Sequence, residues 1–191
     1  CGAAISISTK ECEYCHSPIN ICNLKSLDNL NLQAYIKNFT DLLSKDRSNT
    51  DICTSLAMCC LKLKQYQTAI KHFESMSEEN IVNPNYYYYF AVALLEGKKP
   101  FLTPLNNIKK IVSLLNTAIL LQDTPIYHYF LAYIKYDFYK RKFLNIEPNY
   151  KEELALTINK LSDIDITNFY NEVNQTEPIE LENERRIIWQ I

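Results

Sequence analysis

Glycine is almost missing from this chain: its 191 residues include two, whereas average usage of about 7% would supply about thirteen. Phosphate-binding loops, dinucleotide-binding fingerprints and glycine-dependent hairpins all require this residue at fixed positions. The composition is otherwise that of a globular protein, with 47% hydrophobic and 22% charged residues. Nucleotide-binding α/β folds are therefore excluded, and short helices joined by short loops are favoured.

Apolar residues recur at helical spacing from about residue 26 onward. In the first segment the spacing i, i+3, i+4, i+7 is kept by Leu32, Tyr35, Ile36, Phe39, Leu42 and Leu43. Such spacing places these side chains on one face of a helix. Further helices are predicted near residues 50–63, 65–79, 84–97, 104–122, 125–143 and 149–161, and a weaker one near 166–174.

Three prolines each follow a residue with a capping side chain, at Asn83-Pro84, Thr103-Pro104 and Thr124-Pro125. Proline suits the first helical position because its missing N–H would have no partner there. Asn or Thr before it can accept a hydrogen bond from the first turn. These dipeptides predict helix starts that are capped by Asn83, Thr103 and Thr124.

The helical pattern repeats along the chain. Cys53, Leu56, Ala57 and Cys60 align with Tyr87, Phe90, Ala91 and Leu94 at an offset of 34 residues. They align with His128, Leu131, Ala132 and Lys135 at an offset of 75, which is 34 plus 41. The second step, 41 residues, is seven residues longer than the first, and the loop from Gly97 to Thr103 accounts for this difference. Fixed periods of this size indicate a helical repeat.

The first unit resembles the tetratricopeptide repeat (TPR). In the TPR pattern a large and a small residue are followed by an aromatic residue, an Ala, a second aromatic residue and a Pro. The chain has the matching residues in this order: Leu56-Ala57, Tyr66, Ala69-Ile70, Phe73 and Pro84. The resemblance implies an all-α fold in which antiparallel helix pairs stack as a short TPR-like α-solenoid. Lys110 and Lys135 depart from the pattern in the later units, and a plain helical bundle is the alternative.

The same resemblance implies a concave groove lined by the first helix of each pair. The positions carried over to this groove are Met58, Tyr88, Val92, Tyr129, Tyr133 and Tyr136. Tyrosine offers a large apolar face, a polar tip and few rotatable bonds, which suits peptide contacts. In the alternative interpretation these tyrosines are core residues, or a neighbouring helix of the chain fills the groove.

The polar first segment contains Cys12-Glu-Tyr-Cys15, preceded by Cys1-Gly2. It resembles the latter part of a zinc ribbon, which implies structural Zn²⁺ held by Cys1, Cys12 and Cys15 and by a fourth ligand. That ligand would be a Cys before Cys1, where we expect further chain because the first residue is not Met, or Cys22 or His16. Without it the site would be incomplete or empty. A redox dithiol, a disulfide, idle thiols and a lipid-modified Cys1 are the alternatives.

Other candidate sites are weaker. The carboxylates at Glu152-Glu153 and from Glu180 to Glu184 predict solvated faces, and no nucleophile elbow or paired-acid pattern occurs. The histidines are far apart in sequence, so they predict structural roles. The stretch 135–143 alternates basic and aromatic residues, a pattern that could stack on single-stranded nucleic acid or be an amphipathic helix with a basic end.

We therefore predict three regions: a partial zinc ribbon (1–23), a helical TPR-like domain (24–175) and a C-terminal tail (176–191) that could be a strand, a docking segment or a disordered end. The expected function is that of a non-catalytic adaptor that binds a protein or peptide partner through the groove. Nucleic-acid association through the ribbon and 135–143 is the alternative, disfavoured by a net charge of −2. A small enzyme with a site between helices is a second alternative.

An odd number of cysteines, seven, favours a reducing cytoplasm, and no run of apolar residues is long enough to span a membrane.

Overall fold

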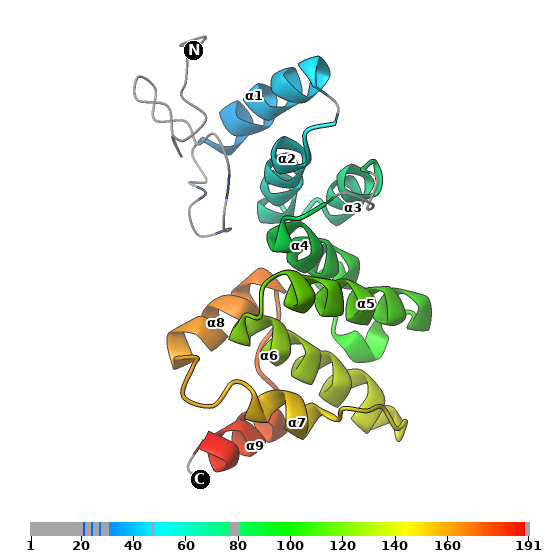
Figure 1. Cartoon of the computed structure of the whole chain (residues 1–191), viewed down its shortest axis with the longest axis vertical. Coiled ribbons are helices and arrows are strands. Elements are labelled where there is room, and N and C mark those ends of the chain that lie inside the picture. The colour runs from blue at the N-terminus through cyan, green and yellow to red at the C-terminus, as the bar shows by residue number, and fades with distance from the viewer. Residues whose placement is uncertain are drawn as a thin grey trace. The chain divides into compact units, whose positions relative to one another are not determined.

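The computed structural model describes residues 21, 24, 27, 31–46, 48–76 and 81–189. These residues form an all-α fold without strands, in which helices pack against their neighbours (Figure 1). The chain divides into two compact units, and the division falls between Tyr86 and Tyr87, inside helix α4 (Pro84–Leu95).

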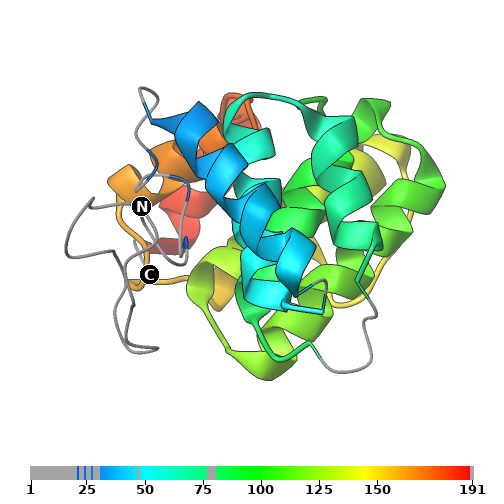
Figure 2. The ribbon, with the colours of Figure 1, turned by 90° about the horizontal axis from the view of Figure 1, so that it is seen from above.

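Unit 1 contains α1 (Leu32–Lys45), α2 (Thr50–Lys62), α3 (Tyr66–Glu74) and the first residues of α4. Helix α2 packs against both α1 and α3, as Figures 1 and 2 show. It is therefore the central helix of the unit, and its nine residues from Cys53 to Leu61 are all buried.

The α2–α3 hairpin is closely packed because small residues lie at its contact. Ala57 and Ala69 are completely buried, which allows the two helices to approach each other. Phe73 is also completely buried, and the ring of Tyr86 meets it edge-to-face at a centroid distance of 5.3 Å. The Tyr86 hydroxyl donates to the Phe73 carbonyl at 2.7 Å, which pairs a buried polar group.

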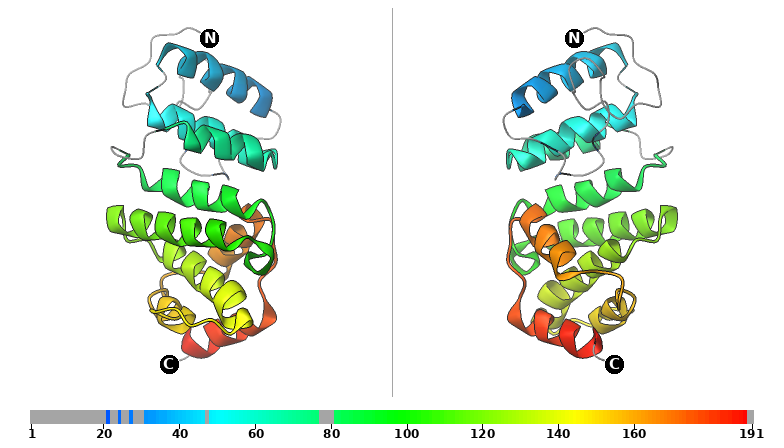
Figure 3. Two further views of the ribbon diagram at one scale, coloured as in Figure 1. Left: turned by 90° about the vertical axis from the view of Figure 1, so that its right-hand side faces the viewer. Right: turned by 90° about the vertical axis from the view of Figure 1, so that its left-hand side faces the viewer.

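Unit 2 contains the rest of α4 and the following helices: η3 (Pro100–Leu102), α5 (Leu105–Leu121), α6 (Pro125–Ile134), η4 (Lys135–Tyr139), η5 (Lys140–Lys142), α7 (Tyr150–Ala155), α8 (Asp163–Glu172) and α9 (Ile179–Trp189). Helix α6 is central and packs against α5 and α7. The two views of Figure 3 show α7 and α9 side by side.

The observed helices follow the predicted segments, and they differ mainly at their ends. The segment predicted over 125–143 is α-helical to Ile134, continues as one π-helical turn and ends as a 3₁₀ turn at Lys142. The segment predicted over 149–161 ends as a helix at Ala155. For the C-terminal tail the sequence left a strand, a docking segment and a disordered end open. The tail contains the helix α9, which packs against α7.

Two of the predicted caps are wrong. Thr124 precedes α6 but makes no side-chain cap, and its hydroxyl donates to the Gln122 carbonyl instead. Helix α5 begins at Leu105, after Pro104, and the Thr103 hydroxyl donates to the Lys99 carbonyl. A threonine hydroxyl can donate as well as accept, so in both cases the preceding carbonyl competes with the helix.

The three alanines that define the repeat offset are all completely buried. They are Ala57 on α2, Ala91 on α4 and Ala132 on α6. The two lysines that depart from the repeat pattern are accommodated differently. Lys110 lies over the Phe90 ring, with its ammonium 4.4 Å from the ring centroid, whereas Lys135 is buried in an ion pair.

Candidate functional site: a tyrosine face closed by the C-terminal segment

The six predicted groove residues are buried in the structure. They are Met58, Tyr88, Val92, Tyr129, Tyr133 and Tyr136, and each is at most 5% exposed. None of them is presented to solvent, so the contacts that cover them determine what the face can bind. The two units cover these residues with different segments of the chain.

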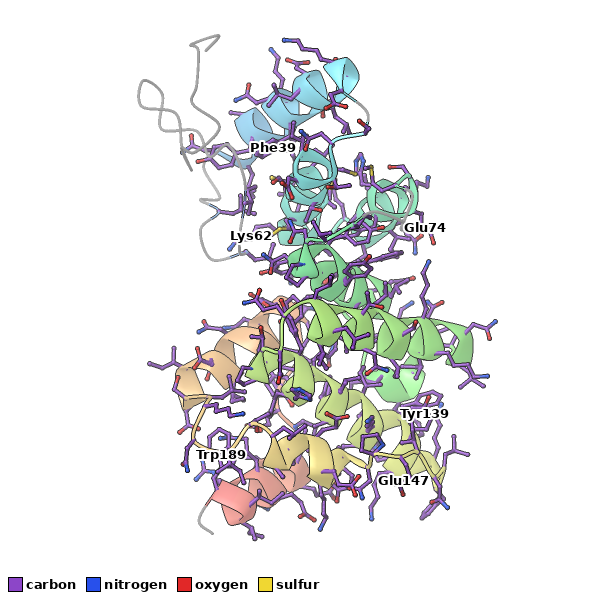
Figure 4. The ribbon with its side chains drawn as sticks, in the orientation of Figure 1. Phe39, Lys62, Glu74, Tyr139, Glu147 and Trp189 are labelled. Atoms are coloured by element: carbon purple, nitrogen blue, oxygen red, sulfur yellow. The ribbon has the colours of Figure 1, made fainter. Side chains whose placement is uncertain are left out.

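In unit 1, residues near the start of the described chain cover α2. Ile21, Leu24 and Leu27 are buried, and the Ile21 amide donates to the Ser55 hydroxyl at 3.0 Å. Lys62, labelled in Figure 4, donates to the Leu24 carbonyl at 3.2 Å. Helix α2, which carries Met58, is therefore contacted by the chain's own N-terminal residues.

In unit 2, aromatic residues of α8 pack on α6. Phe169 lies edge-to-face with Tyr129 at 5.4 Å and with Phe130 at 5.0 Å between ring centroids. Tyr170 lies in the same way against Tyr133, at 5.3 Å. Edge-to-face pairs of buried rings are favourable beyond the area they bury. Helix α8 therefore fills the side of α6 that the sequence predicts as a groove.

Four tyrosine hydroxyls donate hydrogen bonds to four carboxylates in the C-terminal segment, which we define as residues 172–189. The pairs are Tyr88 with Glu172 at 2.8 Å, Tyr129 with Glu177 at 2.6 Å, Tyr136 with Glu180, and Tyr150 with Glu184 at 3.3 Å. We call these four tyrosines the tyrosine face. Hydrogen bonds to an ionised acceptor are shorter and stronger than neutral ones, so the segment is held mainly through its acidic side chains.

Glu177 is the most heavily bonded of these carboxylates. Besides the Tyr129 hydroxyl it accepts from Arg185 Nε at 3.0 Å and Arg185 Nη2 at 3.2 Å. Arg185 is 3% exposed, and its Nη1 also donates to Asp163 at 2.9 Å. The Trp189 ring lies 4.6 Å from the same guanidinium. Glu177 and Arg185 therefore join α6, α8 and α9.

The tyrosines of the face act as hydrogen-bond donors and keep their protons. Burial, followed by the nearby carboxylates, raises the pKa of Tyr88, Tyr129 and Tyr136 above the ordinary value of 10. A hydroxyl with a raised pKa stays protonated near neutral pH, so it can donate to a carboxylate but is poorly suited to act as a base or nucleophile. The chemistry of this face is recognition of acidic groups.

Helix α9 is attached with little apolar burial. Of its residues, Leu181 and Arg185 are buried, whereas Ile179 is 74% and Ile187 is 58% exposed. Elements that bury few apolar groups and depend on polar contacts open with a lower free energy than the core. The attachment of α9 to unit 2 therefore rests largely on the carboxylate contacts.

A second polar cluster joins α6 to α7. Lys135 Nζ donates to Glu153 Oε1 at 2.5 Å, and both side chains are 4% exposed. His128 Nδ1 lies 2.8 Å from Glu153 Oε2, and its Nε2 lies 3.0 Å from Asp123 Oδ1. The bond to Glu153 is the main reason that the pKa of His128 is raised above 6.5. Burial raises the pKa of Glu153, but the bonds from His128 and Lys135 outweigh it and hold that pKa below its ordinary value.

The basic and aromatic residues of the stretch 135–143 are partly used inside the protein. Lys135, Tyr136 and Phe138 are buried, and Arg141 donates to the buried Asp137 at 2.6 Å. Among the alternating residues, those that remain exposed lie at the end of the stretch, where Phe143 is 95% exposed. The described structure therefore offers a shorter basic surface than the sequence suggests.

The predicted zinc ligands Cys1, Cys12 and Cys15 lie outside the described residues, so the zinc ribbon remains a prediction. In the described part of the chain, no group of three or more His, Cys, Asp or Glu side chains is placed to hold a metal ion. The same residues include no helix with the length and apolar character needed to cross a membrane.

The sequence pattern predicts Tyr88, Tyr129 and Tyr136 as one group, but it reveals neither Tyr150 nor the carboxylates that pair with these four tyrosines. Glu153, Glu180 and Glu184 were expected on solvated faces, yet they accept hydrogen bonds from residues of η4 and α7. The spacing of Glu177, Glu180 and Glu184 at three and four residues places them at neighbouring positions of a helical turn. That spacing was the available signal.

Comparison of the chain with protein-family models, with curated proteins and with solved structures finds no match.

Proposed function

We propose that this protein is a non-catalytic adaptor that binds an acidic segment of a protein partner on the tyrosine face. The observation that carries the proposal is the set of four tyrosine-to-carboxylate hydrogen bonds to one C-terminal segment. In this view the segment is an internal ligand, and a partner with carboxylates at similar spacing takes its place. The raised pKa values of the tyrosines support recognition of carboxylates over catalysis.

The TPR-like arrangement of the helices is part of the same proposal. Ala57, Ala91 and Ala132 are buried at offsets of 34 and 41 residues, which supports TPR-like helix pairs packed through small residues. In such a stack the first helices line the binding side. The tyrosines of α4 and α6 are on first helices of the proposed pairs, and this agrees with a ligand-binding role for their face.

Exchange of the internal segment is energetically reasonable. A hydrogen bond to a charged group contributes about 1.5–3 kcal/mol, and a partner's carboxylates would replace these bonds one for one. The remaining attachment includes the buried Val173, the Gln175 amide on the Gly97 carbonyl and the ion pair of Lys151 with Glu184 at 2.8 Å. The buried residues of α9 itself are Leu181 and Arg185. A competing segment with an apolar residue and an arginine at the same spacing would reproduce them.

Binding of a labelled peptide to the full chain tests the proposal. The peptide has the sequence of residues 176–189, and it competes with the internal copy. Replacing Glu177→Gln in the chain, but not in the peptide, weakens the internal copy alone. If the lost contacts are worth about 2 kcal/mol, the apparent affinity for the peptide should rise by a factor of about 30.

The control is Glu182→Gln, which changes a carboxylate of the same helix that pairs with the exposed Arg186. It should leave the affinity within about twofold of wild type, because exposed pairs contribute little. Tyr129→Phe in the Glu177→Gln chain should remove the gain. Absence of binding in every variant, or equal affinities in all, would contradict the proposal.

Nucleic-acid association has less support, since Lys135, Tyr136 and Phe138 are buried. For the compartment we propose a reducing cytoplasm. Cys53, Cys59 and Cys60 are free and buried, and burial raises the pKa of Cys59 to about 12, so these thiols are small core residues. A structural zinc ribbon at the N-terminus is a separate proposal.

A further inference from the structure

Two basic runs of unit 2 are brought together where α6 ends. Lys98 and Lys99 precede η3, and Lys140, Arg141 and Lys142 form η5. The buried carboxylate of Asp137 joins these segments: Oδ2 accepts from the Phe101 amide at 2.8 Å and Oδ1 from Arg141 at 2.6 Å. We call residues 98–102 and 140–144 the basic corner. Tyr139, labelled in Figure 4, marks its place at the edge of the unit.

The corner is positive in a chain whose net charge is −2. It has five basic side chains. The nearby carboxylates are Glu96, Asp137 and Glu147 along the chain and Glu180, which interacts with Arg141, so the net charge is about +1. Lys98 pairs with Glu96 at 2.7 Å and Arg141 with Asp137. Lys99, Lys140 and Lys142 form no ion pair with a carboxylate of the described residues.

Apolar side chains project from the same corner. Phe143 is 95% exposed, Leu102 is 68% exposed and Leu144 is 47% exposed. Phe143 also has a left-handed backbone, with φ 57° and ψ 33°, a conformation that favours glycine. The ammonium group of Lys142 lies 5.0 Å from the Phe101 centroid and 3.9 Å from that of Phe138. Lys142 is therefore held over the buried ring of Phe138, and the exposed Phe143 is the next residue along the chain.

We propose that the basic corner binds the surface of an anionic lipid bilayer, with Phe143 and Leu144 inserted between the headgroups. Segments that lie in the membrane interface typically have lysine and arginine beside exposed Phe and Leu. Two of the three exposed apolar residues are aliphatic. Leucine gains from burial in hydrocarbon but offers no ring to stack on a base, so a lipid surface fits better than single-stranded RNA. The residues of this surface are separate from the four tyrosines, but Arg141 interacts electrostatically with Tyr136 and Glu180, so the variants used below leave Arg141 unchanged.

Vesicle co-sedimentation of the full chain tests the proposal, with phosphatidylcholine vesicles compared to vesicles that also contain phosphatidylserine. We expect binding to the mixed vesicles and little to the neutral ones, and a loss at high salt. Phe143→Gly suits the left-handed backbone and so preserves the fold, and it should lower the affinity at least tenfold. The double replacement Lys99→Ala with Lys140→Ala should lower the affinity about 25-fold, or about fivefold per lysine.

Matched controls are Leu120→Ser, at an 87% exposed position of α5, and Lys109→Ala on the same helix. Both should bind like wild type. Equal sedimentation with neutral and anionic vesicles, or equal losses in control and corner variants, would overturn the proposal. If labelled single-stranded RNA binds with the same variant dependence and vesicles do not, the corner is a nucleic-acid site and the lipid assignment is wrong.

Discussion

The buried pair of Lys135 and Glu153 gives the sharpest test of how unit 2 is held together. Glu153→Gln removes the negative charge and leaves the ammonium group of Lys135, 4% exposed, without a carboxylate. Breaking a buried ion pair from one side costs about 3–5 kcal/mol. The amide oxygen of Gln can still accept one bond, so we expect the lower end, about 3 kcal/mol. With a slope of about 2 kcal/mol/M in urea, the unfolding midpoint falls by about 1.5 M.

The assay is urea unfolding followed by far-UV circular dichroism at pH 7. The matched control is Glu147→Gln, the same chemical change at an exposed position labelled in Figure 4, which should change the unfolding free energy by less than about 0.5 kcal/mol. The double variant Lys135→Met with Glu153→Gln should recover most of the loss, because it removes the unpaired ammonium group and keeps a side-chain amide beside His128. A loss below 1 kcal/mol in Glu153→Gln, or a double variant as unstable as the single one, would refute this reasoning.

Two further predictions concern pH and metal. The pKa of folded His128 is raised above 6.5, mainly by the hydrogen bond to Glu153, so its stabilising contribution is present below pH 6.5 and is lost as the pH rises through the folded pKa. The unfolding free energy, measured in urea, should therefore fall as the pH rises above 6.5, and a His128→Gln chain that keeps the same slope would contradict this. Full-length protein should contain about one zinc per chain by elemental analysis, and Cys12→Ser with Cys15→Ser should remove it; equal metal content in wild type and variant would exclude the ribbon.

Helices that bury one face could be predicted from the period of their apolar residues. Leu32, Tyr35 and Phe39, which define the first periodic segment, are the buried residues of α1. The ends of the helices were harder to predict, because a short polar side chain can bond either to an amide of the helix or to a preceding carbonyl. Asn149 and Ser162 form capping boxes with Glu152 and Asp165, whereas Thr124 turned toward a preceding carbonyl.

The pairing of distant polar residues could not be predicted from periodicity. Lys135 looked like a mismatch in the repeat, and Glu153, 18 residues later, looked solvated; the structure joins them in a buried pair. The tyrosines were identified as a related group, but a TPR-like groove and a face covered by the chain's own helix have the same local pattern. Only the tertiary contacts of α8 and α9 distinguish the two for unit 2.

The last helix also carries the one tryptophan of the chain, among fourteen tyrosines, and its ring lies against the Arg185 guanidinium. Indole emission shifts to longer wavelength when water reaches the ring, and selective excitation separates it from tyrosine. The indole Nε1 atom is buried, so detachment of α9 should expose it to water, and the emission of this single tryptophan should report that change. Displacement of that helix by any ligand can be titrated without attaching a dye.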